Sequence, residues 1–152
     1  MLKSRYLTLL LIFLGLYASA QKIELIDGIY FEGRKQYSGI YIDTNNKGEI
    51  CQKIEIINGK QNGKTIIYYQ NGKIKEERYF KEGLRDSIWT TWSEEGKKIA
   101  IAQFFNNLKD GNWIIWDEKG IMRYDMYYKN GEKIATWRMW DENGKLIQEK
   151  KY

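Results

Sequence analysis

A glycine recurs at a fixed interval through most of this 152-residue chain. The interval is 24 residues, and one column at this spacing holds Gly48, Gly72, Gly96, Gly120 and Gly144. A second column at the same spacing reads Gly39, Gly63, Ser87, Gly111 and Ala135. Self-similarity at a short period is typical of repeat architectures, in which one supersecondary unit recurs and neighbouring units complete each other's core. The sequence therefore constrains the architecture more tightly than the function.

Each period contains two strand-like segments. The first has about six residues rich in aromatic and β-branched types, as strands prefer. Its copies are IYIDTN, KTIIYY, IWTTWS, NWIIWD and TWRMWD, starting at Ile40, Lys64, Ile88, Asn112 and Thr136. The second segment has about eight residues, and its last position is apolar or aromatic in every copy: Ile56, Phe80, Phe104, Tyr128 and Tyr152. The pattern predicts two strands in every period.

Two polar turns join these segments. One turn ends in the glycine of the first column, where glycine supplies the positive φ of a short hairpin loop. The other is Asn58-Gly59, Glu82-Gly83, Asn106-Asn107 or Asn130-Gly131, each followed by a short polar connection. Asn-Gly between strand-like runs is the strongest short-range hairpin signal. We therefore expect consecutive strands to pair as antiparallel hairpins.

The predicted fold class is all-β, an elongated antiparallel meander of tandem 24-residue β-hairpin repeats. The repeat domain covers residues 39–152 and contains about ten strands, because two strands and two tight turns leave no room for a helix in a period. Residues 21–38 follow the pattern imperfectly, with Gly28 and Gly33 between loosely alternating apolar residues. Terminal repeats are usually atypical, so this segment is interpreted as a degenerate N-terminal capping unit.

Residues 1–20 have a different character. Lys3 and Arg5 form a positive start, residues 7–16 are almost wholly apolar, and Ala18-Ser19-Ala20 is the small-residue pattern that a signal peptidase recognises. The apolar run is shorter than the about 20 residues of a membrane span. We predict a signal peptide cleaved near Ala20 and a protein secreted to the periplasm or outside the cell. The alternative is an uncleaved N-terminal anchor, and helix is expected only in this segment.

Charge and cysteine content exclude some classes of function. The formal net charge is +5, or +3 without Lys3 and Arg5, and the charges alternate along the chain. Nucleic-acid binding favours a basic face or stripe, so we expect no nucleic-acid partner. The single cysteine, Cys51, cannot form an internal disulfide, and its apolar neighbours favour a strand side chain over a reactive thiol.

The six tryptophans occupy two columns of the repeat. Trp89, Trp113 and Trp137 form one column, and Trp92, Trp116 and Trp140 form the other, which continues to Tyr68. Residues three apart in a strand point to opposite faces unless a bulge intervenes, so either both faces carry aromatic stripes or a bulge joins the columns. Every tryptophan is either a ladder residue of the sheet or part of a contact surface. These seven aromatic residues are the candidate binding site.

Nothing in the sequence indicates catalysis. The chain contains no histidine, the commonest general base and metal ligand. Carboxylates such as Glu94, Glu118 and Glu142 recur at turns, where acidic residues serve solvation and turn formation. Asp117 and Asp141 follow tryptophans, but no dense Asp/Asn/Gly ligand loop for Ca²⁺ surrounds them. We expect a protein that is not an enzyme and has no cofactor, metal or catalytic residue.

One repeated phrase carries a family resemblance. G-x-W-x-x-W-D-E-x-G-K is best matched by residues 111–120 and 135–145, and K-N-G-x-K follows a strand at residues 129–133. The phrase resembles the bacterial variant of the MORN repeat (MORN_2), as found in proteins labelled YwqK-type antitoxins. The resemblance covers about residues 39–152. It implies a chain of β-hairpins with a role in protein contact, membrane-lipid contact or scaffolding, and the antitoxin label implies a toxin partner.

Three functions remain open from the sequence. The leading hypothesis is a secreted, non-catalytic protein-interaction module or scaffold that presents Tyr68, Trp92, Trp116 and Trp140 to a protein partner. The second is binding of a membrane surface or a glycan, in which Lys73, Lys97 and Lys145 flank the aromatic residues. The third is an antitoxin or immunity protein that binds a cognate toxin.

Overall fold

The long sheet and a small N-terminal sheet make up the described part of the molecule. A computed structural model of the protein describes residues 22–152, which form strands and turns and no helix. Accordingly, these residues contain no helix long and apolar enough to cross a membrane. The predicted signal peptide lies outside the described residues. The small sheet contains β1 (Ile23–Ile26), β2 (Ile29–Glu32) and β3 (Lys35–Gln36).

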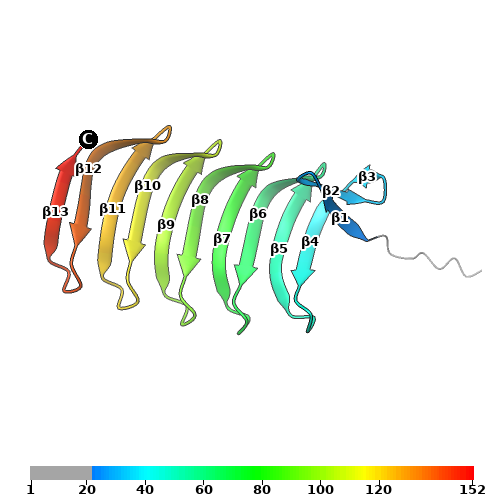
Figure 1. Ribbon diagram of the computed structural model, residues 1–152, viewed down its shortest axis with the longest axis horizontal. Helices are drawn as coiled ribbons and strands as arrows, with labels where there is room; N and C mark the ends of the chain where they lie inside the picture. The colour runs from blue at the N-terminus through cyan, green and yellow to red at the C-terminus, as the bar shows by residue number, and fades with distance from the viewer. Residues whose placement is uncertain (1–21) are drawn as a thin grey trace, which may run out of the picture.

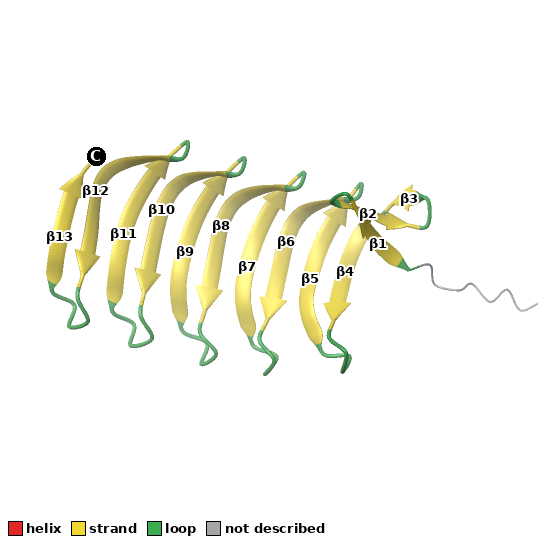
Figure 2. Ribbon diagram, viewed as in Figure 1, coloured by secondary structure: helices red, strands yellow, loops and turns green. Residues whose placement is uncertain are grey.

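Ten strands form the long sheet (Figures 1 and 2). They are β4 (Gly39–Thr44), β5 (Ile50–Ile57), β6 (Lys60–Tyr68), β7 (Ile74–Lys81), β8 (Leu84–Trp92), β9 (Lys98–Phe105), β10 (Leu108–Trp116), β11 (Met122–Lys129), β12 (Glu132–Trp140) and β13 (Leu146–Lys151). Each strand pairs antiparallel with the next one along the chain, from β4 to β13. The predicted all-β meander of tandem hairpins is therefore confirmed.

Two kinds of turn lie on opposite edges of the sheet. The upper turns, at the top of Figure 1, are the dipeptides Asn58-Gly59, Glu82-Gly83, Asn106-Asn107 and Asn130-Gly131. Both residues of each have positive φ, for example 49° at Asn130 and 87° at Gly131. This combination defines the type I′ turn, whose twist matches that of paired strands. The lower turns are residues 45–48, 69–72, 93–96, 117–120 and 141–144, and in each the N–H of the final glycine donates to the carbonyl of the first residue.

The strands that follow the upper turns are longer than predicted. The expected strand began at Lys64, whereas β6 begins at Lys60 and includes the supposed polar connection. The reason is a bulge: Ile54 pairs with Thr65 and Ile56 pairs with Gln61, so three residues of β6 lie opposite one residue of β5. A bulge keeps both sides of such a segment paired while it bends the strand. The second glycine column therefore belongs to the strands and not to the turns.

The bulge explains the residue types in that column. Its members have positive φ, 108° at Gly63 and 107° at Gly111, against 55° at Ser87 and 60° at Ala135. At Gly111 an added Cβ would collide with Oε1 of Gln103. That oxygen accepts a hydrogen bond of 2.6 Å from the backbone N–H of Asn112, so it cannot move away freely. Glycine is required at Gly111 both by backbone conformation and by space.

Neighbouring hairpins are also joined along the upper edge. Three upper turns donate backbone hydrogen bonds to the strand that follows the preceding upper turn, with the pairs Gly83 N to Gln61 O at 2.8 Å, Asn107 N to Arg85 O at 2.9 Å and Gly131 N to Lys109 O at 2.8 Å. The small sheet takes the corresponding place at the start of the array, where Gly59 N donates to Tyr37 O at 2.8 Å. Tyr30 there packs with Ile54 and Ile56 in a buried cluster. The small sheet thereby covers the first hairpin of the long sheet.

Candidate interaction surfaces

One tryptophan column belongs to a continuous aromatic ladder on one face of the sheet. The tryptophans alternate with aromatic residues at the upper ends of β7, β9, β11 and β13. The ladder consists of Phe80, Trp89, Phe104, Trp113, Tyr128, Trp137 and Tyr152, with successive ring centroids 4.8 to 5.5 Å apart. All pairs are tilted or edge-on, the arrangements that aromatic quadrupoles favour. Phe104 and Tyr128 are buried between their neighbours although the sheet has a single layer.

The ladder tryptophans are also tied to the backbone. Their indole Nε1 atoms donate to the carbonyl of the residue ten positions earlier: Trp89 to Tyr79 at 3.0 Å, Trp113 to Gln103 at 3.0 Å and Trp137 to Tyr127 at 2.9 Å. Gln103 lies opposite the bulge of β10, where the pairing between β9 and β10 is interrupted. Buried carbonyls need a donor, and the indole supplies one. The tryptophans of the ladder therefore supply the hydrogen bonds that the interrupted strand pairing at the bulge leaves open.

Cationic side chains line the ladder. Arg85 lies 4.8 Å from the Phe104 ring, and Lys109 lies 4.2 Å from the Trp113 ring and 4.7 Å from the Tyr128 ring. Lys133 makes the same pair of contacts one repeat later, with Trp137 and Tyr152. A cation over an aromatic face contributes about 0.5–1 kcal/mol at exposed sites. The ladder is thus a row of aromatic rings flanked by a row of cationic side chains, Arg85, Lys109 and Lys133, which we call the positive row.

The second column consists of Tyr68, Trp92, Trp116 and Trp140, and its surroundings differ. Ile115 pairs with Tyr124 and Trp116 with Met122, so the extra residue at this irregularity lies in β11 and β10 keeps its alternation. Trp113 and Trp116 consequently point to opposite faces, which decides between the two arrangements that the sequence allowed. Within residues 22–152, rings of the second column take part in no aromatic pair, and Lys53 is the cation beside Tyr68, at 5.9 Å.

The hydrogen-bond state of the indoles separates the two columns most clearly. All six tryptophans are half-buried. In the described part of the chain, the Nε1 atoms of Trp92, Trp116 and Trp140 have no hydrogen-bond partner, and they are not among the buried atoms that lack one. Solvent therefore reaches these three N–H groups. The three tryptophans of the second column therefore keep their indole donors available for another molecule.

The acidic residues beside the second column stabilise their own turns. Oδ1 of Asp117 accepts backbone hydrogen bonds from Lys119 and Ile121, both at 3.0 Å, and Asp141 does the same in the last turn. Partial desolvation opposes ionisation of Asp117, but the bonds from Ile121, from the Arg123 side chain and from Lys119 lower its pKa overall. Residues 22–152 contain no group of three or more side chains suited to hold a metal ion.

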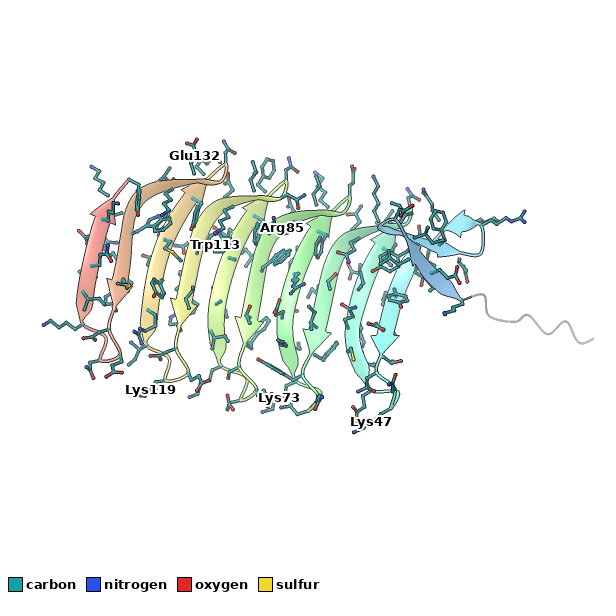
Figure 3. The ribbon with its side chains drawn as sticks, viewed as in Figure 1. Lys47, Lys73, Arg85, Trp113, Lys119 and Glu132 are labelled. Carbon is teal, nitrogen blue, oxygen red and sulfur yellow. The ribbon has the colours of Figure 1, made fainter. Side chains whose placement is uncertain are left out.

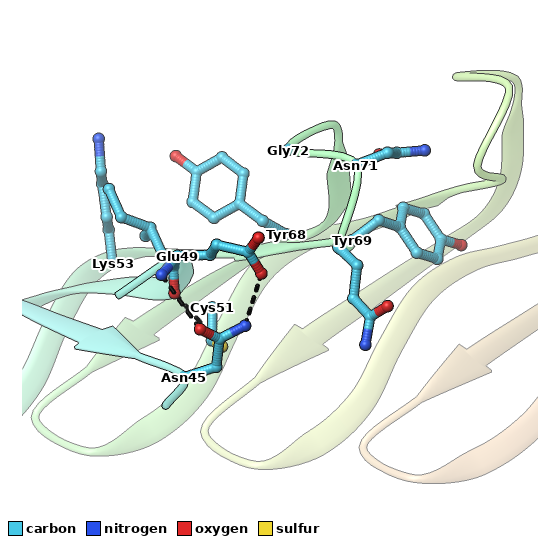
Figure 4. Close-up of a pocket in the computed structure, with 10 residues that line it drawn as sticks. Asn45, Glu49, Cys51, Lys53, Tyr68, Tyr69, Asn71 and Gly72 are labelled. Carbon is cyan, nitrogen blue, oxygen red and sulfur yellow. Dashed lines mark hydrogen bonds between the residues drawn. The ribbon is translucent and has the colours of Figure 1, made fainter. Parts of the chain in front are cut away.

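A groove of about 440 Å³ opens between the first two lower turns (Figure 4). Tyr68, Lys53, Cys51, Glu49 and Gln70 are among the residues that line it. Among the members of the second column, Tyr68 lines this groove, whereas Trp92, Trp116 and Trp140 are not among its lining residues. A smaller recess of about 200 Å³ lies on the ladder face beside Trp137 and Tyr152.

Sequence reasoning located both tryptophan columns but missed their partners. The apolar column from Phe80 to Tyr152 was recognised as a strand position, yet its alternation with the tryptophans in one ladder was not foreseen. The cations Arg85, Lys109 and Lys133 also recur at the 24-residue interval, each just after an upper turn, in the segment taken for a polar connection. Recognising that segment as strand would have placed these cations next to the rings.

The comparisons with known proteins concern the repeat and the shape of the chain. The model of the MORN repeat variant matches residues 61–82, 109–130 and 133–152, which confirms the resemblance at these three places. The antitoxin-like subfamily stays a prediction. No curated protein matches the chain. A similar solved structure is the crystal structure of a GtfA/B complex bound to UDP and GlcNAc, with a TM-score of 0.32, 12% sequence identity and 89% of this chain covered. This chain spans 29% of the length of that one.

Proposed function

We propose that this protein is a non-catalytic interaction module that holds a protein partner against the second column. Repeats of the matched kind generally serve protein or membrane interaction, which supports a binding role. The observation that carries the choice of surface is the free Nε1 of Trp92, Trp116 and Trp140, since the ladder indoles are already occupied. Tryptophan and tyrosine are enriched at binding hot spots because they combine a large apolar ring with a polar tip.

The spacing of the column suits an extended partner. Equivalent residues in successive repeats lie two strands apart, about 10 Å at about 4.8 Å per strand. Tyr68 and the three indoles are the last residues of β6, β8, β10 and β12, so they form a row across the strands. The row runs beside the lower turns, at or next to which Figure 3 labels Lys47, Lys73 and Lys119. A partner segment lying along this row would contact one aromatic ring per repeat.

In this proposal the protein works outside the cytoplasm, in the periplasm or beyond. The support comes from the positive start, the apolar run and the small residues before Gln21. N-terminal sequencing of the protein purified from its native envelope tests the idea. Gln21 as first residue is the expected result, whereas an intact Met1 would favour an uncleaved anchor.

The test of the surface uses two triple variants. Replacement of Trp92, Trp116 and Trp140 by alanine removes the rings, and replacement by phenylalanine removes the indole donors while keeping apolar rings. Affinity capture from native envelope extract, followed by mass spectrometry, should retain a protein with the wild type and lose it with the alanine variant. The phenylalanine variant should retain less of it. Equal retention by all three folded proteins, checked by circular dichroism, would sink the proposal.

Membrane-surface binding is the second candidate function, and the positive row favours it. Arg85, Lys109 and Lys133 lie beside aromatic rings on the ladder face, and cations with aromatic residues are suited to the interface of an anionic membrane. Co-sedimentation with anionic liposomes distinguishes this function. Binding that is lost when the three cations become glutamine would support it, and no binding at low salt would exclude it.

A further inference from the structure

Side chains bridge successive lower turns of the long sheet. Lys73 Nζ donates to the Glu94 carbonyl at 2.9 Å, and one repeat later Lys97 Nζ donates to the Glu118 carbonyl at 3.0 Å. In the last gap Arg123 Nε donates to the Trp140 carbonyl at 2.9 Å. Three of the four gaps between lower turns therefore hold a cationic side chain bonded to a backbone carbonyl in the next turn or, for Arg123, directly before it.

The first gap lacks such a bridge. The position of Lys73 and Lys97 is occupied by Glu49, a carboxylate that cannot donate to a carbonyl, and the position of Arg123 is occupied by Cys51. Asn45 directs its Nδ2 donor to Oε2 of Glu49 at 2.7 Å, within its own turn (Figure 4). No side-chain hydrogen bond in the described residues joins residues 45–51 to the second lower turn. This gap is the groove of about 440 Å³.

The groove consequently keeps acceptors that no donor of its own lining fills, since Lys53, which also lines it, lies over the Tyr68 ring at 5.9 Å and has no hydrogen bond to Gln70 or Glu49 in the described residues. The carbonyl of Gln70 is the counterpart of the Glu94 and Glu118 carbonyls, because it lies 21 residues after Glu49 as they lie after their lysines. Among residues 22–152 it accepts no side-chain hydrogen bond. The second oxygen of Glu49 adds a negative charge at the same place, and the Tyr68 ring adds an apolar wall. Such surroundings fit a primary ammonium group on an aliphatic stem.

We infer that this groove binds a lysine side chain of the protein partner, whose ammonium takes the place that Lys73 and Lys97 fill in the next two gaps. The ammonium donates to the Gln70 carbonyl and to Glu49, and its methylene stem lies along Tyr68. This inference deepens the proposed function, because Tyr68 is the first member of the second column. The groove therefore sets one end of the partner's path along the sheet.

The test is a variant in which a lysine of the chain itself fills the first gap. In Glu49→Lys the new side chain should bridge to Gln70, as Lys73 bridges to Glu94, and raise the melting temperature. Backbone amide chemical shifts of residues 68–72 in the full chain are followed during titration with Nα-acetyl-lysine methylamide and with a lysine-containing peptide. The wild type should shift with both ligands, and Glu49→Lys should bind at least about tenfold more weakly.

Three further measurements keep the test specific. The Nε-acetylated ligand, which lacks the charge, should produce no shift, and spermidine should bind no more tightly than the peptide if the natural ligand is a protein. Lys97→Glu should create a second responsive gap at residues 118–120. The inference is overturned if the wild type shows no shift at residues 68–72, or if Glu49→Lys binds equally well. Partner capture that is unchanged in the tryptophan variants, with the titration intact, would instead contradict only the aromatic column.

Discussion

The two ends of each hairpin are stabilised by different means, and tryptophan appears at both. In the upper half, the bulge, the ladder and the backbone bonds between hairpins form a continuous structure, and Trp113 is held by two rings, one cation and one carbonyl. In the lower half, side chains bridge separate turns, and Trp116 lies three residues away from Trp113 with an indole donor that has no partner among residues 22–152. A single-layer sheet can thus build its core from one row and leave the indole donors of another row open to solvent.

The comparison predicts opposite results for neighbouring tryptophans. Trp113→Ala should interrupt the ladder and leave the Gln103 carbonyl without its donor, lowering the free energy of unfolding by about 3 kcal/mol. Trp116→Ala removes a ring that has no aromatic neighbour in the described residues, and should cost no more than about 1 kcal/mol. Chemical denaturation of both variants measures the difference. Equal losses would show that the second column is as structural as the first.

A more conservative pair of substitutions separates the contribution of the indole N–H from that of the aromatic ring. Trp113→Phe keeps a ring in the ladder but removes the 3.0 Å bond to the Gln103 carbonyl, and should cost about 1 kcal/mol. Trp116→Phe removes a donor with no partner in the described chain, so its free energy of unfolding should stay within about 0.5 kcal/mol of the wild type. If both substitutions are neutral under the same denaturation conditions, the indole bond does not stabilise the bulge.

Periodicity predicted the fold because every unit is local. An upper turn such as Asn130-Gly131 and the strands on either side of it form one hairpin, so residues close in sequence specify its register. The bulge at Gly111 was not foreseen, since it depends on the Gln103 side chain and the Trp113 indole coming together from two strands. Glycine at this position signals positive φ, but the same signal serves turns and bulges.

The candidate surface was predictable only in part. The sequence separated Trp113 and Trp116 into two columns but could not say which column faces the ring of Tyr128. That choice depends on a diagonal contact across strands, which composition does not specify. The open first gap was likewise hidden, because Glu49 is informative only beside Lys73 in the neighbouring turn.

Acid titration compares a carboxyl of the upper half with one of the lower half. Asp110 accepts a bond from the backbone N–H of Asn130 at 3.1 Å and pairs with Lys129, and these contacts, the backbone bond first, lower its pKa below the ordinary value of 3.8. Asp117 also has a lowered pKa, but its backbone donors belong to its own turn. Only Asp110 receives these bonds from the tip of the next hairpin.

A carboxyl with a depressed folded pKa stabilises the protein above its unfolded pKa, and this contribution disappears as the pH falls through the folded pKa. Asp110→Asn, which removes the charge but keeps an acceptor, should therefore lower the melting temperature slightly at neutral pH and flatten its decline below about pH 4. Asp117→Asn should change the same profile, but amide hydrogen exchange should accelerate at Lys119 and Ile121 instead of Asn130. If Asp110→Asn leaves both the melting profile and the exchange of Asn130 unchanged, the upper turns are held by their backbone bonds alone.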